Sequence, residues 1–146
     1  IDLAEFVRHC CEGYRAMHAG RALSVGVPGG RAELTCAPDL LAQALDKLVD
    51  NAMSLSGDAD EVRVTLRSAE RCYELAVANS GSRLPDELQE RLFDSLVSLR
   101  DQRGAEPHLG LGLYIVRLVA EAHGGTVRAA NLAGGEGVEF VISLPC

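Results

Sequence analysis

The sequence predicts an α/β protein, a two-layer sandwich with a mostly antiparallel, mixed sheet covered on one face by helices. Apolar residues alternate with polar ones in short paired segments, and longer segments with helical periodicity lie between the pairs. A doubly wound parallel sheet would need single strands that alternate with helices, and this order does not occur. The length of 146 residues suits one domain, which we assign to residues 1–146.

Helical periodicity predicts three main helices. The first is Leu3–His18, the second begins at Pro38, where a missing N–H costs nothing, and the third is Leu109–Ala122. The buried stripe of the second helix consists of Leu41, Ala44, Leu45, Leu48 and Ala52. His123 follows the third helix, where a cationic ring suits the helix dipole. A further helical pattern, Leu88–Leu99, lies inside a long polar stretch.

Period-two alternation predicts the strands, which we place at 23–27, 33–36, 61–67, 73–77, 127–129 and 138–144. Glycine and polar residues at 28–30, 68–71 and 133–135 mark the links between consecutive strands. We therefore expect the strands to pair as hairpins, with one face of the sheet covered.

Composition limits the classes of function. Hydrophobic residues make up 47% of the chain and aromatic residues 4%, so Leu, Val and Ala must fill the core. The formal net charge of −7 disfavours a nucleic-acid partner, because no basic surplus exists to neutralise phosphates. The five cysteines lack a C-x-x-C pair, so we expect reduced thiols in a cytosolic domain. No apolar run is long enough to cross a membrane, and a start at Ile1 suggests a part of a longer protein.

The second helix carries a polar face. At 100° per residue, this face holds Gln43, Lys47, Asp50, Asn51 and Ser54, opposite the apolar stripe. The amide oxygen of Asn51 can ligate a hard cation such as Mg²⁺, and Lys47 can meet phosphate oxygens. The alternative is an ordinary solvated helix face.

Two further motifs are candidates for ligand contacts. Asn79 follows a strand directly and can hydrogen-bond a purine edge, while Gly81 permits a bend or the close approach of a ligand. The alternative for this segment is a plain turn. Gly110 and Gly112 begin a helix, where free backbone N–H groups and the helix dipole favour an anion. The alternative there is a flexible helix start.

In this order and spacing, the motifs resemble the catalytic ATP-binding domain of bacterial sensor histidine kinases. That domain belongs to a superfamily with gyrase-type topoisomerases, mismatch-repair ATPases and a heat-shock chaperone, and the resemblance implies a Bergerat-type ATP-binding fold. The matching segments are Leu41–Ser56 (asparagine box), Val77–Pro85 (first glycine box), Leu92–Asp94 (phenylalanine box), Leu109–Gly125 (second glycine box) and the terminal hairpin from Gly134 to Pro145. The resemblance covers essentially the whole chain.

The resemblance implies that ATP and Mg²⁺ are the cofactors, with Asn51 as the metal ligand. The residues implied to bind the nucleotide are Asn51, Lys47, Asn79, Gly81, Leu84, Phe93, Gly110, Leu111, Gly112 and Leu113, and no catalytic residue is assigned. The chain departs from the family's pattern at several positions. Asn79 stands where an aspartate is usual, Lys47 where an asparagine is common, and Ser54 where a basic residue is common. Arg83 and His108 each stand where a glycine is usual.

The implied activity is transfer of the γ-phosphate of ATP to a histidine in an upstream helical hairpin that this sequence lacks. The resemblance also implies a cognate response regulator, a homodimeric parent protein anchored in the bacterial inner membrane, and a cytoplasmic location for this domain. Segment Asp94–His108 is expected to form a lid ordered by phosphates, with Arg100 or Arg103 as phosphate contacts. The alternatives are a degenerate nucleotide-binding or protein-interaction module without kinase activity, and a serine kinase of the anti-sigma type.

Overall fold

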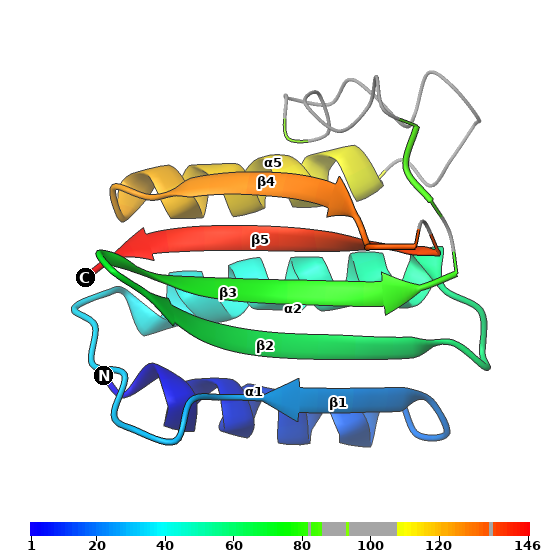
Figure 1. The fold of residues 1–146 in the computed structure, drawn as a ribbon, viewed down its shortest axis with the longest axis horizontal. Helices are drawn as coiled ribbons and strands as arrows, with labels where there is room; N and C mark the ends of the chain where they lie inside the picture. Colours follow the sequence, from blue (N-terminus) through cyan, green and yellow to red (C-terminus); the bar gives the residue numbers. More distant parts are fainter. Residues whose placement is uncertain (82, 86–92, 94–107, 135) are drawn as a thin grey trace.

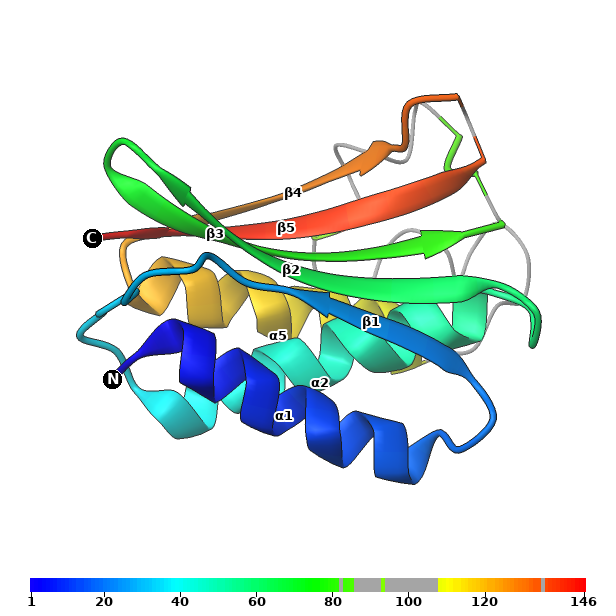
Figure 2. The same ribbon diagram turned by 60° about the horizontal axis from the view of Figure 1, so that its bottom comes forward.

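The chain folds into two layers, a five-stranded sheet and a set of helices packed on one of its faces (Figures 1 and 2). The computed structural model describes residues 1–81, 83–85, 93, 108–134 and 136–146. Within this part, the helices are α1 (Leu3–Met17), α2 (Pro38–Leu55) and α5 (His108–Ala122), and the strands are β1 (Ala22–Gly26), β2 (Glu61–Ala69), β3 (Cys72–Ser80), β4 (Thr126–Asn131) and β5 (Gly137–Pro145). The predicted fold class and all three main helices are confirmed.

The helices begin where the sequence provides the right end groups. Asp2 is the N-cap of α1, and its carboxylate accepts a hydrogen bond of 2.9 Å from the amide of Ala4. Pro38 occupies the first turn of α2, as predicted. The predicted stripe of α2 is buried throughout and packs toward the sheet. Because α2 presents one apolar side to the core, its opposite side is free to carry polar groups.

The strands lie in the order β1-β2-β3-β5-β4. Strands β2 and β3 form a hairpin closed by the two-residue turn Glu70-Arg71, and β4 and β5 form a second antiparallel pair. Strand β1 is parallel to β2, and the chain passes from one to the other through α2. The sheet is therefore mixed, with one parallel pair at its β1 edge.

Segment 33–36 corrects the predicted strand pairing. Segment 33–36 is not a strand of the sheet. Strand β1 pairs with β2 and does not form a hairpin with segment 33–36. Leu34 exchanges backbone hydrogen bonds of 3.0 Å and 2.9 Å with Ile1, and the amide of Leu3 donates to the carbonyl of Ala32 at 2.8 Å. The backbone groups of this segment are thus satisfied by the residues that lead into α1, which leaves the edge of β2 open to β1.

The core lies between the sheet and the helices. Its largest fully buried side chains include Phe140, Leu75, Ile142 and Leu144 from the strands, and Leu41, Leu45, Leu48 and Leu113 from the helices. Burying one such side chain contributes about 1.5–3 kcal/mol. Truncating Phe140 to Ala would cost about 3–5 kcal/mol, because the ring is completely buried on β5, which has a paired strand on each side.

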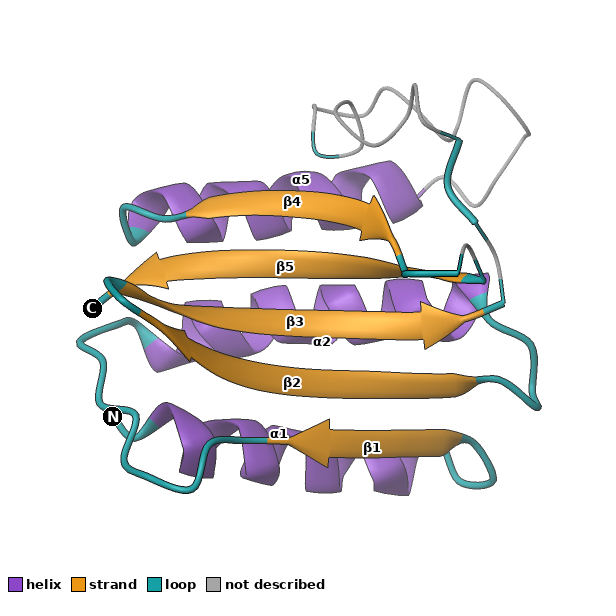
Figure 3. Cartoon of the chain, viewed as in Figure 1, coloured by secondary structure: helices purple, strands orange, loops and turns teal. Residues whose placement is uncertain are grey.

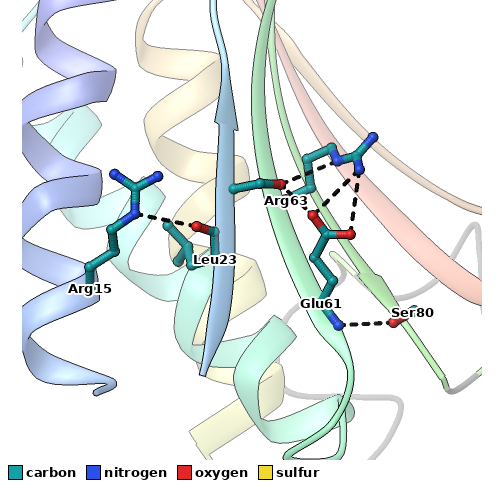
Figure 4. A network of polar contacts seen from close by, with 6 residues as sticks. Arg15, Leu23, Glu61, Arg63 and Ser80 are labelled. Atoms are coloured by element: carbon teal, nitrogen blue, oxygen red, sulfur yellow. Dashed lines mark hydrogen bonds and ion pairs between the residues drawn. The ribbon is translucent and has the colours of Figure 1, made fainter. Parts of the chain in front are cut away.

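Polar contacts on the outer face connect the strands near the end of β3 (Figure 4). The hydroxyl of Ser24 donates to Glu61 at 2.7 Å, and Arg63 contacts both of them. The Ser24 hydrogen bond and the Arg63 guanidinium lower the pKa of Glu61. The amide of Glu61 donates to the hydroxyl of Ser80 at 3.0 Å, which connects the first residue of β2 to the last residue of β3. The exit of β3 is therefore fixed from its outer side.

Some expectations fall on residues outside the described part. These are the helical pattern at 88–99 and almost all of the predicted lid, including Arg100 and Arg103. Among the helices that are described, none combines the length and apolar character needed to span a bilayer.

Candidate functional site

A hollow lies between the second half of α2 and the first turns of α5. It is lined by Lys47, Asp50, Asn51 and Ser54 from α2 and by Leu111, Gly112 and Ile115 from α5. Its volume of about 80 Å³ has room for several water-sized groups. In Figure 1 this is the end of the molecule where β3 finishes and α5 begins. Two of the three predicted motifs thus meet in one hollow.

Asn51 is the buried member of this wall. Its exposed fraction is 3%, yet neither its amide oxygen nor its amide nitrogen has a hydrogen-bond partner within the described residues. The sequence placed Asn51 on a polar face opposite the apolar stripe, and that interpretation was partly wrong. Gln43, Lys47 and Asp50 are exposed, but Asn51 lies on the border where α5 packs along α2.

An amide left without partners in a buried position costs about 1–3 kcal/mol. The Asn51 amide therefore suits a ligand, because neither of its polar atoms has a partner in the described part of the chain. The free amide oxygen is a suitable ligand for a hard cation such as Mg²⁺, and it lies beside the carboxylate-bearing residue Asp50 in the same wall. The donor set of the hollow fits the metal that the sequence predicted.

Lys47 of α2 and Gly112 of α5 lie against each other at the hollow. A Cβ atom added to Gly112 would lie 3.6 Å from Cδ of Lys47, so the aliphatic stem of the lysine passes over the glycine. Lys47 is exposed and is the only lysine in the sequence. Its aliphatic stem lies against Gly112, and the residue lines the hollow.

Asn79 is a second buried amide with a free oxygen. It pairs with Val62 in the ladder, so its side chain faces the helical layer, and its exposed fraction is 1%. Its amide nitrogen donates to the carbonyl of Ser80 at 3.2 Å, and its oxygen has no partner in the described part of the chain. With the nitrogen engaged, the side chain offers an acceptor, which is the group that a purine amino group requires.

Gly81 has a backbone conformation that favours glycine. Its φ angle is 107°, and a Cβ atom there would lie 2.6 Å from Oδ2 of Asp60. The structure therefore explains Gly81 by a bend and by the closeness of Asp60. No sequence pattern pointed to Asp60.

Leu84 and Phe93 are predicted nucleotide contacts that the structure places in the core. Leu84 is buried, and its backbone is held by Asn131, whose amide accepts from Leu84 N at 2.7 Å and donates to Leu84 O at 2.9 Å. Phe93 is buried against Phe140, with ring centroids 6.2 Å apart in an edge-to-face arrangement. Neither residue lines the hollow within the described residues.

The glycine-rich start of α5 divides between the hollow and the core. The helix begins at His108, so Gly110 lies in its first turn, where backbone N–H groups lack helical partners. Leu111 and Gly112 line the hollow, whereas Leu113 is 1% exposed and belongs to the core. The sequence analysis missed Ile115, which lines the hollow and could have been found from its spacing of four residues from Leu111.

A mixed sheet covered on one face by helices, with free buried amides at one end, is typical of an ATP-binding domain of the Bergerat type. Residues 36–146 match the family described as "Histidine kinase-, DNA gyrase B-, and HSP90-like ATPase". The chain therefore belongs to this family, whose shared property is an ATP-binding domain.

The most similar proteins include sensor histidine kinases. The sensor histidine kinase CusS of Escherichia coli (strain K12) is 29% identical over 147 aligned positions, which span 99% of this chain and 30% of CusS. The structure of the mycobacterial sensor histidine kinase MprB has a TM-score of 0.84 and 26% identity, and the match covers 99% of this chain and 96% of that chain.

A third related structure contains a partner. Histidine kinase ThkA in complex with response regulator protein TrrA matches with a TM-score of 0.78 and 22% identity, over 99% of this chain and 40% of that chain. At this identity the likeness concerns the fold alone.

Proposed function

We propose that this chain is the catalytic domain of a two-component sensor histidine kinase. In this proposal it transfers the γ-phosphate of ATP to a histidine in a helical hairpin upstream in the same protein. The bond between the γ-phosphorus and its bridging oxygen breaks, a bond from that phosphorus to an imidazole nitrogen forms, and ADP leaves with the bridging oxygen. The observation that supports this function most strongly is the pair Asn51 and Asn79, two buried amides whose oxygens have no partner in the described chain.

The two amides have different roles in the proposal. Asn51 offers its oxygen to Mg²⁺, and Asn79 offers its oxygen to the amino group of adenine. Bound Mg²⁺ neutralises negative charge on the phosphates. Lys47 in the lining of the hollow supplies a further positive charge, and the first turn of α5, with Gly110, supplies amides and the positive end of a helix dipole.

The proposal also concerns the parent protein and its partner. We infer a homodimeric sensor, anchored in the bacterial inner membrane, whose cytoplasmic part includes this domain and acts with a cognate response regulator. The similarity to CusS, a sensor histidine kinase, supports the sensor role in this proposal. The ThkA–TrrA complex, which shares the fold, is an example of a histidine kinase with a response regulator as its partner. Because the chain spans only 30% of CusS, the signal-receiving and phosphoacceptor parts would lie in other segments of the protein.

A second candidate function is a nucleotide-binding or protein-interaction module without kinase activity. Two positions favour it. Asn79 has a neutral amide where an aspartate is usual, so its bond to an amino group lacks charge assistance. Ser54 places a hydroxyl in the wall of the hollow where a basic residue is common.

Calorimetric titration with a non-hydrolysable ATP analogue, with and without Mg²⁺, separates the two functions. We expect binding that Mg²⁺ strengthens, together with a higher thermal midpoint. A ligand that binds only the native state stabilises it by about 2.7 kcal/mol at a hundredfold excess over its Kd. Absence of stabilisation at millimolar nucleotide would favour the module. Phosphohistidine formation in the parent protein, after incubation with labelled ATP, then tests the transfer step.

A further inference from the structure

The guanidinium group of Arg21 lies against the end of α2. Arg21 belongs to the connection between α1 and β1, and its side chain donates three hydrogen bonds. Nη2 donates to Ser56 Oγ at 2.7 Å and to Gly57 O at 3.2 Å, and Nη1 donates to Met53 O at 3.5 Å. Figure 3 shows that this connection and the turn after α2 lie at the same end of the molecule as the exit of β3. Arg21 therefore contacts the end of α2 from a distant part of the sequence.

The end of α2 needs such a contact. The last carbonyl groups of a helix have no helical partners, and a cation stabilises that end of the helix dipole. Helix α2 has no basic residue in its last turn, so Arg21 supplies the charge from outside the helix. Ser56 completes the end, since its amide and its hydroxyl both donate to the carbonyl of Ala52, at 3.1 Å and 2.7 Å.

Arg21 is also connected to the backbone at Gly81, through the turn that follows α2. Gly57, whose carbonyl accepts from Arg21, donates its amide to Oδ2 of Asp60 at 2.7 Å, and the amide of Asp60 returns a bond of 3.0 Å to Gly57 O. The Asp60 carboxylate lies where a side chain at Gly81 would be, 2.6 Å from an added Cβ atom. A continuous series of contacts thus runs from Arg21 through Gly57 and Asp60 to the backbone that follows Asn79.

We propose that Arg21 is a positioning residue of the nucleotide site, which sets the end of α2 that carries Asn51 and Ser54 and the backbone at Gly81. This inference rests on the proposed function, in which Asn51 of α2 binds Mg²⁺ and Asn79 of β3 binds adenine. Arg21 lies before the segment 36–146 that matches the ATPase family, so the match does not include it. Its effect passes through Met53, Ser56 and Gly57 and involves no contact with the ligand.

The test is the Kd of a non-hydrolysable ATP analogue, measured with and without Mg²⁺ below the unfolding transition. Arg21→Met keeps the length of the stem and removes the donors, and we expect it to raise the Kd by about tenfold, because the site loses its alignment. Arg21→Lys, which keeps the charge, should recover part of the affinity. The matched control is Arg31→Met, since Arg31 is 83% exposed and pairs with Glu33, and its Kd should stay within about twofold of wild type.

The dependence on Mg²⁺ distinguishes positioning from general destabilisation. If Arg21 acts by placing Asn51, Arg21→Met should reduce the gain in affinity from Mg²⁺, whereas a variant that is only less stable should keep that gain below its unfolding transition. An Arg21→Met variant with a lower Tm but a Kd within twofold of wild type would overturn the proposal.

Should Arg21→Met fail to fold, Ser56→Ala decides, because it removes the acceptor of the shortest Arg21 bond. Unchanged Kd values in Ser56→Ala and Arg21→Lys together would overturn the role of Arg21. A wild-type chain that binds no nucleotide would refute the proposed function itself, and the role of Arg21 with it. A wild-type chain that binds, with variants that bind equally well, would refute Arg21 alone.

Discussion

The imidazole of His123 accepts a hydrogen bond of 3.0 Å from the amide of Ala37, and this bond connects the end of α5 to the start of α2. The other ring nitrogen, Nδ1, lies 2.7 Å from the carbonyl oxygen of Val119 and donates to it. In this arrangement Nε2 is the acceptor for the Ala37 amide, and Nδ1 faces the carbonyl of Val119. Ala37 is the N-cap of α2 and has no side-chain cap, so His123, which follows α5, satisfies one of the amides at this helix start that lack helical partners.

His123→Ala should therefore lower the free energy of unfolding by about 1 kcal/mol, because the Ala37 amide loses its acceptor. His123→Gln places an amide oxygen near the position of Nε2 and should retain most of the stability. Urea denaturation of both variants measures the difference. Equal losses in the two variants would contradict the capping role.

Asn51→Ala should separate stability from ligand binding. Removing a buried amide without partners should raise the free energy of unfolding of the ligand-free chain by about 1 kcal/mol. The same change should abolish the Mg²⁺-dependent part of nucleotide binding. Gln43→Ala is the control, because Gln43 is exposed on the same helix and does not line the hollow. Binding that Mg²⁺ still strengthens in Asn51→Ala would exclude Asn51 as the ligand.

Asn79→Asp should bind adenine nucleotides more tightly by about 1 kcal/mol, because a neutral acceptor becomes a charged one. The ligand-free variant should be less stable than wild type, since it buries a carboxylate without a partner. Titration with ATP and with a purine analogue that lacks the amino group measures the effect. If Asn79 accepts from that amino group, only ATP should gain from the substitution, and equal or weaker ATP binding would disprove the assignment.

The raised pKa of Cys11 predicts a loss of stability at alkaline pH. Burial, with a smaller contribution from Cys10, raises the pKa of Cys11 from 9.0 to about 12. Between these values the unfolded chain loses the proton and the folded chain keeps it, so the unfolded state binds fewer protons and stability falls as pH rises. The contribution of Cys11 is fully present below pH 9.0 and is lost as pH rises toward about 12.

Urea midpoints between pH 8 and pH 11 measure this dependence. Cys11→Ala should unfold more easily at every pH and show a shallower alkaline decline, while Cys146→Ala, at an exposed position, should decline as wild type does. Identical slopes in Cys11→Ala and wild type would show that Cys11 does not titrate in this way.

Sequence patterns predicted the helices and strands whose residue spacing alone determines which side chains are buried. The alternation in β2 and the stripe of α2 depend on residues near one another in sequence, and the structure has them as predicted. In β3 the predicted Leu75 and Val77 are buried, but so is Ala76 between them, which the alternation did not predict. Segment 33–36 could not be decided in this way, because its partner is Ile1, more than 30 residues away.

The candidate site shows the same division. Asn51 and Asn79 could be identified from motifs, but their burial depends on how α5 and the helical layer cover them, which no local pattern contains. The contacts of Arg21 and Asp60 depend on loops that meet only in the folded chain, and nothing in their sequence neighbourhood indicated them.

The turn Glu70-Arg71 lies at the end of the β2–β3 hairpin opposite the hollow (Figure 1). Strand β3 has nine residues, so its length of about 30 Å separates the turn from the exit of β3. Both turn residues are exposed. A fluorophore or a short peptide inserted there would report on the domain from a position remote from bound nucleotide, which makes this turn a suitable attachment point for a biosensor built on the chain.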